Sequence, residues 1–584
     1  MVVWGVITVA LTELLSPFHL LRRVPLAVAW TVAGAVLLAY LYRRRAKVPR
    51  GKFRPVECTI AVVIAGMAAV VGVTAWLSPP NSADAMAYHM PRVLYWAQAG
   101  SVAFFPTPYF NQITLQPLAE YFALHTYVLS GGDHFVNLVT FGAFCGSIAG
   151  VSAIAAAMGL GARAQALAAL VCATLPNGIL QASGAKNDWL LTLWLVAMVY
   201  FAVRCDRWFT GLALGLALAT KATAYLFAPP ILLAVLWGRA EWRRIAAPLA
   251  AAVLLINFPQ YARNWRLSGS PLGYDSAQGD GFFRWRNEHP GWKSTVSNAL
   301  RHLSDQLGAR SPQWNLGVFD AVVRIHRALS LDPQDPATTW RWSRYEPPLN
   351  ANHEANANNR WHLLLLVLAS LWAIWRSRTW TVYAAGLAGA FLLFCFYLKW
   401  QPFLARLELP LFVLGAPLAA FALGARRPAV LSLAAALFLV TNARLPLVDN
   451  WTRPLKGPHS LLVTSRDGNY FSDMSQWNNR SSYLEAVERT ARTGCATVGM
   501  DISENQLEYP FEALLRERNR AVWFEHTGVE NASARYYPVN PPRPCVVLCL
   551  DCIGNQKKMA LYREMGPPVT IGRFLLFGAI LTPQ

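Results

Sequence analysis

Long apolar blocks alternate with short polar stretches through the first three quarters of the chain. A helix that crosses a bilayer needs about 20 consecutive, mostly apolar residues. Residues 1–20 hold a weaker candidate, because Glu13, Pro17 and His19 interrupt it. Blocks of the required kind predict twelve further membrane helices, at 24–42, 58–77, 134–158, 164–182, 189–203, 207–220, 224–237, 245–262, 360–376, 379–398, 408–424 and 429–445. The pattern therefore predicts an all-α polytopic membrane bundle of about 12–13 transmembrane helices.

The pattern changes after residue 446, where short apolar strands alternate with helical segments. Such alternation is typical of a parallel or mixed sheet. We therefore predict a transmembrane domain at 1–446 and a soluble α/β domain at 447–584. The segments of the second domain are a helix at Ser482–Arg492, a strand at Ala496–Met500, a helix at Tyr509–Arg518, and strands at Ala521–Glu525 and Cys545–Leu550.

Composition supports this division. Hydrophobic residues make up 54% of the chain and charged residues only 14%, whereas an ordinary soluble protein carries about 25% charged residues. These proportions exclude a disordered chain, a disulfide-stapled miniprotein and a plain cytosolic enzyme.

The formal net charge of +20 belongs to the membrane part, because residues 447–584 are nearly balanced. The basic residues lie in short loops between apolar blocks, which is typical of the positive-inside rule and not of nucleic-acid binding. The pair Arg22–Arg23 is an exception, since it falls on the outer side or at the interface. The strongest cluster, placed in the cytoplasm, is Arg43, Arg44, Arg45, Lys47, Arg50, Lys52 and Arg54. The other basic loops then fall on the same side, at Arg163, Arg204, Arg207, Arg239, Arg243, Arg244, Arg376, Arg378, Arg426 and Arg427.

This orientation predicts a multi-pass protein of the inner (plasma) membrane whose site and C-terminal domain are extracytoplasmic. Functional residues concentrate on loops that a rigid scaffold holds. In the long outer loop 78–133, Pro117–Leu129 predicts an amphipathic helix in the interface plane. The tryptophans of loop 263–359 predict a folded cap over the bundle.

Asp84, soon after the predicted helix 58–77, is the first candidate for chemistry. A carboxylate at that depth is expensive unless it faces water or a partner. It could act as a general base toward an acceptor hydroxyl, or it could cap a helix. His89 and Arg92 follow at helical spacing and could bind phosphate or orient Asp84, although Arg92 could instead pair with a carboxylate.

Asp188 lies in a short outer loop, two positions after Lys186, and could converge with Asp84 at one mouth. The alternative is a cap for the helix that follows. Lys221, among apolar neighbours, could hold an anionic head group or snorkel to the interface.

Arginines on other outer segments could bind a phosphate leaving group. Arg263 with Asn264 follows the helix 245–262, and Arg406 precedes the helix 408–424. Arg406 could alternatively pair with Glu408 or Asp188.

His353 and Glu354 could ligate a divalent metal or contact a sugar. Without a third ligand, two adjacent residues are a weak signal for a metal site. We therefore predict no metal site and no cofactor, and a bound divalent cation is kept as an alternative. Five cysteines in or beside the apolar blocks indicate packing residues. The four in the tail predict one or two disulfides of undetermined pairing: Cys495, Cys545, Cys549 and Cys552.

This pattern resembles the GT-C glycosyltransferases, polytopic enzymes that take a sugar from a polyprenyl-phosphate carrier on the outer face of the membrane. Within this superfamily it resembles the bacterial branch near the protein O-mannosyltransferases and the lipid A aminoarabinose transferases. The resemblance covers roughly residues 58–450 and rests on the order and shared side of its motifs. These motifs are Asp84 in the first outer loop, Ala182–Asp188, Gly215–Lys221 and Arg263–Leu272, the last close to the family's Arg-Asn…Gly-Asn-Pro run.

The resemblance implies that Asp84 is the catalytic base and Asp188 a supporting acid, while Lys221, Arg263 and Arg406 hold the carrier phosphate. Many members carry two adjacent acids in the first loop, whereas Asp84 stands alone here. This departure favours a metal-independent reaction. The full set of predicted substrate-binding residues is His89, Arg92, Lys186, Lys221, Arg263, Asn264, His353, Glu354 and Arg406.

The predicted function is an inverting transfer of a hexose or pentose to a hydroxyl group, and the acceptor is a lipid, a glycan or a protein. One alternative is a transporter or flippase of a lipid-linked saccharide, which would use the same cavity without covalent change. No clear internal repeat of the transporter kind is present in the sequence. A scaffold that presents the tail domain is a third interpretation, and it leaves the polar residues unexplained.

Overall fold

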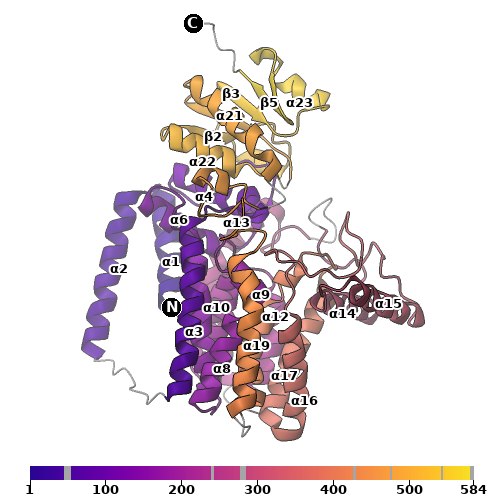
Figure 1. The fold of residues 1–584 in the computed structure, drawn as a ribbon. Coiled ribbons are helices and arrows are strands. Elements are labelled where there is room, and N and C mark those ends of the chain that lie inside the picture. Colours follow the sequence, from indigo (N-terminus) through magenta and orange to yellow (C-terminus); the bar gives the residue numbers. More distant parts are fainter. Residues whose placement is uncertain are drawn as a thin grey trace.

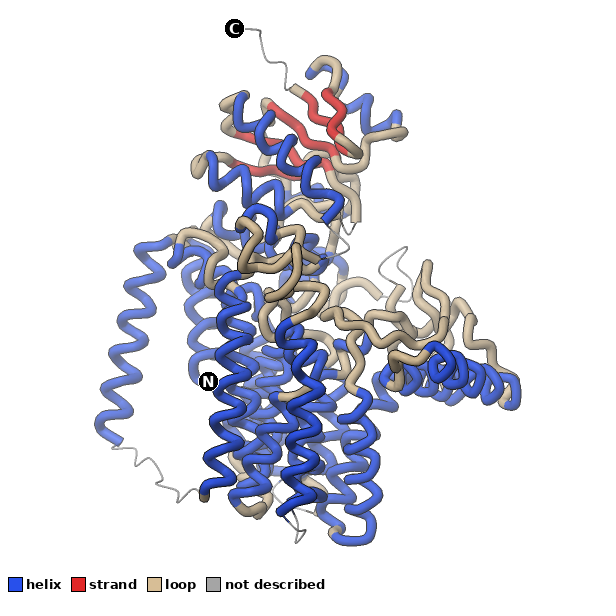
Figure 2. The backbone as a smooth tube through the Cα atoms, viewed as in Figure 1, coloured by secondary structure: helices blue, strands red, loops and turns tan. Residues whose placement is uncertain are grey.

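The computed structural model describes residues 1–44, 54–238, 242–275, 284–424, 429–473, 477–504, 506–540 and 543–578. A helical bundle forms the lower part of the molecule, and a small α/β domain stands above it (Figure 1). The strands gather in that upper domain (Figure 2). Several of the basic residues that are predicted to be cytoplasmic lie outside the described residues. They are Arg45, Lys47, Arg50, Lys52, Arg239, Arg426 and Arg427.

Helices occur at all twelve positions that the apolar pattern predicts, and a further helix occupies the N-terminus. Among the described residues, six helices are long and apolar enough to cross a membrane on length and composition: α2, α3, α7, α13, α17 and α19. The helices of the bundle are α1 (Val2–Leu15), α2 (Arg23–Arg44), α3 (Pro55–Leu77), α7 (Asn137–Ala157), α8 (Ala162–Ala173), α10 (Asp188–Val203), α11 (Arg207–Thr220), α12 (Ala224–Val235), α13 (Trp242–Ser268), α16 (Arg360–Arg376), α17 (Arg378–Tyr397), α18 (Leu409–Gly424) and α19 (Ala429–Val448).

The predicted helix 164–182 is wrong as a single element. Helix α8 ends at Ala173, and α9 (Pro176–Gln181) begins after a break in which Leu175 has an extended backbone. A proline disfavours the helical conformation in the residue before it and has no backbone N–H to donate. The break changes the direction of the chain. Residues 182–187 then lead into the group of ionisable residues around Asp188 that is described below.

The first long loop, 78–133, folds into short helices: η2 (Ala85–His89), α4 (Met90–Ala99), α5 (Asn111–Thr114) and α6 (Leu118–Ser130). Helix α6 confirms the helix predicted at Pro117–Leu129. Its residues Leu118–His125 are all buried. The predicted position in the interface plane is therefore wrong, because a helix there would leave one face to the lipid.

The segment 263–359 contains two amphipathic helices, α14 (Trp292–Gln306) and α15 (Pro312–Ala328). They project to one side of the bundle and do not cover it (Figure 1), which corrects the predicted cap. Helix α14 is bonded to Glu408, at the start of α18, through His302 and Gln306. The loop before α16, where His353 and Glu354 lie, also returns to the bundle.

The C-terminal domain has a mixed five-stranded sheet in the order β2-β1-β3-β5-β4. Strands β2, β1 and β3 are parallel, and β5 and β4 continue the sheet antiparallel. The predicted strands and helices are confirmed, and α23, β4 and β5 are additional. The bounds are α21 (Arg480–Arg492), β1 (Thr497–Asp501), α22 (Tyr509–Arg518), β2 (Trp523–His526), β3 (Val546–Cys549), α23 (Gln556–Leu561), β4 (Val569–Ile571) and β5 (Phe574–Phe577).

Two disulfides, Cys495–Cys545 and Cys549–Cys552, form in this domain. The domain also bonds to the first long loop. Asp133 accepts hydrogen bonds from the hydroxyls of Tyr470 (2.6 Å) and Tyr509 (2.9 Å). The α/β domain is thereby fixed to the loop that contains Asp84.

Candidate active site

Asp84 precedes η2 and forms an ion pair with Arg406, which lies in the short turn η4 (Leu404–Arg406). The Asp84 side chain makes no capping bond to η2, so the helix-cap alternative is not observed. Burial by itself would raise the pKa of Asp84, but Arg406, Lys186 and His89 together hold it well below its ordinary value. Asp84 is therefore an ionised carboxylate at neutral pH.

Asp188 is the first residue of α10. It forms an ion pair with Lys221, at the end of α11, with 2.5 Å between Oδ1 and Nζ. Burial lowers the pKa of Lys221 from its ordinary value, Asp188 opposes this effect, and Arg406 reinforces it. Arg406 interacts electrostatically with both Asp84 and Asp188. The two ion pairs thus form one group of four residues, which we call the Asp84 cluster: Asp84, Asp188, Lys221 and Arg406.

Lys186 and Glu354 form a third ion pair beside this cluster, with 2.5 Å between Nζ and Oε1. Glu354 also pairs with Arg453, which lies in the segment after α19. Burial would raise the pKa of Glu354, but Arg453 and Lys186 lower it to about 2. Because Lys186 also lowers the pKa of Asp84, the Lys186–Glu354 pair belongs to the same electrostatic environment.

Arg453 joins three separate segments at the base of the site. Besides Glu354, it donates to the Asn81 side-chain oxygen (2.8 Å), the Ser183 hydroxyl (2.9 Å) and the Leu180 carbonyl (2.6 Å). These partners precede Asp84 and Asp188 in their loops. Arg453 is therefore a positioning residue for both carboxylates.

His89 and Arg92 lie behind Asp84 and share the carboxylate of Glu120. His89 Nδ1 is 2.7 Å from Glu120, and Arg92 is 3.7 Å from it. Arg92 also donates to the carbonyls of Ile113 and Leu115. The alternative in which Arg92 pairs with a carboxylate is therefore observed. Of the residues in this group, His89 is the one whose charge lowers the pKa of Asp84.

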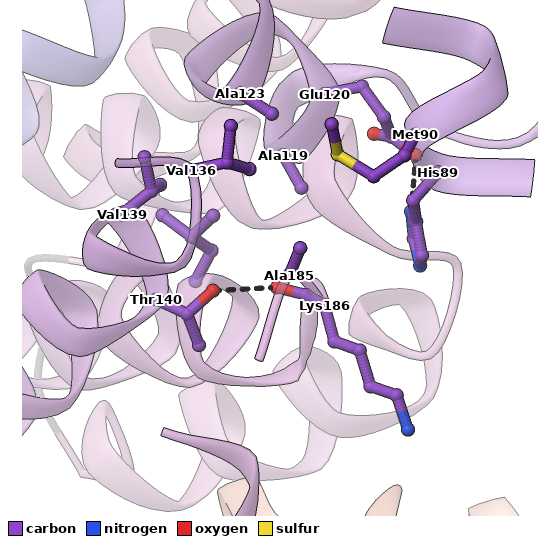
Figure 3. Close-up of a pocket in the computed structure, with 11 residues that line it drawn as sticks. His89, Met90, Ala119, Glu120, Ala123, Val136, Val139, Thr140, Ala185 and Lys186 are labelled. Carbon is purple, nitrogen blue, oxygen red and sulfur yellow. Dashed lines mark hydrogen bonds and ion pairs between the residues drawn. The ribbon is translucent and has the colours of Figure 1, made fainter. Parts of the chain in front are cut away.

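A small cavity of about 20 Å³ lies between His89, Glu120 and Lys186 (Figure 3). A cavity of about 10–15 Å³ or more by this measure holds one water molecule. In Figure 3 the His89–Glu120 bond borders the cavity, and the Lys186 ammonium points away from it. The cavity is therefore of water size and not of sugar size.

Arg263 and Asn264 make their contacts at a different place. Arg263 donates to both oxygens of Glu13 (2.9 and 2.8 Å) and to the hydroxyl of Tyr121 (2.7 Å). Asn264 donates to the carbonyls of Thr114 and Pro271. Arg263 therefore joins the end of α13 to α1 and α6, and Asn264 joins it to α5 and to the loop after α13.

His353 bonds through Nε2 to Asp473, at 2.8 Å, while its neighbour Glu354 points into the Lys186–Arg453 group. The one grouping among the described residues with metal-ligand spacing is Asp501, Cys549 and Cys552. Its two cysteines are bonded to each other. A divalent cation near Asp84 therefore stays a prediction.

Sequence reasoning missed Arg453, Glu120 and Tyr88. Tyr88 lies beside Asp84, and burial followed by the Asp84 charge raises its pKa. Its place within the stretch Ser82–Arg92 was a usable signal. Arg453 and Glu120 carry no local signal, because their partners lie far away in the sequence.

Two solved structures share the fold of this chain. The fold matches that of ArnT from Cupriavidus metallidurans in the apo state, at 14% sequence identity and a TM-score of 0.52, over 91% of this chain and 100% of that chain. The same protein bound to undecaprenyl phosphate matches at 15% identity and a TM-score of 0.52, over 90% and 99% of the two chains. The Archaeoglobus fulgidus oligosaccharyltransferase tethered with an acceptor peptide aligns at 14% identity and a TM-score of 0.45, over 86% and 70%.

No protein-family model matches the sequence, and no curated protein matches it. The likeness to the solved structures is a likeness of fold. ArnT is a lipid A aminoarabinose transferase of the GT-C superfamily. The resemblance to GT-C enzymes that the sequence motifs indicated is therefore confirmed at the level of the fold.

Proposed function

We propose that this protein is a membrane glycosyltransferase that moves a sugar from a polyprenyl-phosphate carrier to an acceptor hydroxyl. The observation that carries the proposal is the Asp84 cluster, two carboxylates and two cations on an ArnT-like fold. Such a cluster offers both a proton acceptor and a phosphate-binding pair. The undecaprenyl phosphate bound to ArnT is a phosphate on a polyprenyl chain, which supports a donor of that class.

In the proposed step, the acceptor hydroxyl oxygen attacks the anomeric carbon from the face opposite the phosphate. A new carbon–oxygen bond forms, the bond to the carrier phosphate breaks, and the hydroxyl proton passes to Asp84. The departing polyprenyl phosphate keeps the bonding electron pair. Arg406 and Lys221 stabilise its charge, an electrostatic contribution that is often the largest in such reactions. Direct displacement inverts the anomeric configuration.

The ion pairs of the cluster imply that the donor phosphate binds before Asp84 accepts the proton. Arg406 is bonded to Asp84, and Lys221 to Asp188. A donor phosphate would draw Arg406 away from Asp84, and the pKa of Asp84 would then rise because its strongest stabilising charge has left. A carboxylate of higher pKa is a stronger base. Phosphate binding would thereby activate Asp84.

The remaining predicted residues take supporting roles in this proposal. Lys186 and His89 lie within electrostatic range of Asp84 and would complete the donor site. The others act through the loops that they hold, and these are Arg92, Arg263, Asn264, His353 and Glu354.

We also propose that the cluster and the α/β domain face the extracytoplasmic side of the inner membrane. The described basic residues Arg43 and Arg54 lie at the ends of α2 and α3 that are remote from the α/β domain (Figure 1). Cytoplasmic loops carry an excess of Lys and Arg. The α/β domain would then be on the opposite side, where its two disulfides can persist.

The test uses purified protein in lipid nanodiscs, a panel of radiolabelled polyprenyl-phosphate sugars and a membrane extract as acceptor source. The wild type should move label from carrier to product, and Asp84→Asn should reduce the rate by about 100-fold or more while the donor still binds. Asp320→Asn, at an exposed position of α15, is the matched control and should transfer normally. Saturable donor binding without transfer by the wild type would favour the transporter alternative and overturn the proposal.

A further inference from the structure

A second cavity lies between the N-terminal helices and the α/β domain. Its volume is about 640 Å³, within the range of about 300–1,000 Å³ that is typical of ligand pockets. None of the Asp84 cluster lines it, and four arginines do: Arg22, Arg23, Arg516 and Arg520. The cavity is thus basic and separate from the proposed donor site.

The acids of this cavity neutralise only part of its positive charge. Four arginines face two carboxylates, Asp133 and Glu517, and Asp133 already pairs with Arg466 and accepts bonds from two tyrosines. Within the described part of the chain, none of the four lining arginines forms an ion pair, and Arg22, Arg23 and Arg520 are exposed. The lining therefore presents several guanidinium groups, which can bind phosphate oxygens bidentately.

The cavity lies where a lipid could reach it. Arg22 and Arg23 stand at the start of α2, which is set apart from the bundle (Figure 1). Only 6% of the apolar window of α2 is buried. Its tie to the bundle includes a hydrogen bond from Trp30 Nε1 to His125 Nδ1 of α6 (3.1 Å). Acyl chains can therefore lie along both sides of α2, directly below the arginines.

The position of the cavity gives a reason for the departure of Arg22–Arg23 from the positive-inside rule. These arginines lie at the end of the bundle that faces the α/β domain, opposite to Arg43 and Arg54 (Figure 1). The positive-inside rule disfavours basic residues on that side. The apolar side chains of Leu21, Val128 and Phe135 also line the cavity, as an amphiphilic ligand requires.

We propose that this cavity binds the phosphate headgroup of a membrane lipid from the leaflet on the side of the α/β domain. The four arginines hold the phosphate, and the acyl chains lie against α2. The site does not depend on glycosyl transfer, and its ligand need not be the sugar donor.

Native mass spectrometry of the full chain in detergent tests the proposal, with phosphatidylglycerol as the probe. Diacylglycerol, which has no phosphate, and inorganic phosphate, which has no acyl chain, are the comparison ligands. We expect tight binding of phosphatidylglycerol alone. Inorganic phosphate that binds as tightly as phosphatidylglycerol would overturn the lipid assignment, and diacylglycerol that binds as tightly would overturn the role of the phosphate.

The triple variant Arg22→Gln/Arg23→Gln/Arg520→Gln should bind phosphatidylglycerol about tenfold or more weakly, since each basic residue contributes to anionic-lipid attraction. The control Arg492→Gln/Arg543→Gln/Arg563→Gln removes three exposed arginines elsewhere in the α/β domain and should bind normally. Asp84→Asn should also bind normally, which separates this site from the donor site. An unchanged affinity in the first triple variant, with an unchanged melting temperature, would overturn the proposal.

Discussion

Arg406 and Asp84 are 322 positions apart in the sequence, and their side chains form an ion pair. The pair joins the first long loop to the segment that precedes α18. It also explains why a half-buried carboxylate stays ionised, because burial alone would favour its protonated form. In the proposed reaction, a base held in this way would be charged before the substrate arrives and would gain basicity when its partner leaves.

Replacing Arg406 by Gln should therefore change the pH profile of transfer. The pKa of Asp84 is low because charges, above all Arg406, outweigh burial. Without Arg406 the pKa should rise, because the largest stabilising charge is lost while burial remains. Protonated Asp84 cannot accept a proton, so the acid limb of kcat/KM should move to higher pH. The pH–rate profiles of both proteins are measured. The compared quantity is the position of the acid limb, because a lower rate is expected of the variant in any case. Coincident acid limbs would show that Arg406 does not set the protonation of Asp84.

Removing Arg453 should destabilise the bundle. Its side chain and that of Glu354 are both 1% exposed, so Arg453→Ala leaves a buried carboxylate with Lys186 as its remaining cation. Breaking a buried ion pair costs about 3–5 kcal/mol of unfolding free energy. The double variant Arg453→Ala/Glu354→Gln removes the orphaned charge and should recover part of that loss. Melting curves in detergent provide the comparison, and equal melting temperatures for the single variant and the wild type would contradict the role of Arg453.

The two disulfides should contribute unequally to the α/β domain. Cys495–Cys545 spans 50 residues, whereas Cys549–Cys552 spans 3. In the chain-entropy description, a longer closed loop removes more freedom from the unfolded chain, which gives about 4 kcal/mol for the first disulfide and about 2 for the second. Cys495→Ser/Cys545→Ser should thus lower the melting temperature of the domain more than Cys549→Ser/Cys552→Ser. The reverse order would show that packing around the second disulfide dominates.

Glu512, in α22, should make stability depend on pH. Burial, reinforced by the charge of Glu508, raises its pKa well above the ordinary value. The folded state therefore holds a proton that the unfolded state releases above about pH 4.3. The contribution to stability is complete below that pH and is lost as the pH rises through the folded-state pKa. Glu512→Gln should raise the melting temperature relative to the wild type at pH 8 and match it at pH 4. A difference that is independent of pH would contradict this account.

The helices of the bundle could be predicted because their signal is local. A run of apolar residues of the required length needs no partner to be recognised, and Pro176, which breaks 164–182, is itself visible in the sequence. The order of α22 between β1 and β2 was likewise predictable, since alternating helical and extended patterns repeat over short distances. The fold class thus followed from the residues themselves.

The site was predicted in part. Asp84, Asp188, Lys221 and Arg406 were each identified from loops that flank apolar helices, and the structure brings them together. Arg263 carried the same kind of signal, and the structure pairs it with Glu13 instead. A basic residue at a helix end has no local feature that distinguishes a phosphate ligand from a partner of a distant carboxylate.

The sequence by itself determined which segments are helical and which loops carry ionisable groups, because these depend on neighbours along the chain. Only the tertiary structure decided which charges meet. Arg453 reaches Glu354 from 99 positions away, and Arg406 reaches Asp84 from 322. The energy of an ion pair depends on distance and burial in space, and neither quantity is written in the local pattern.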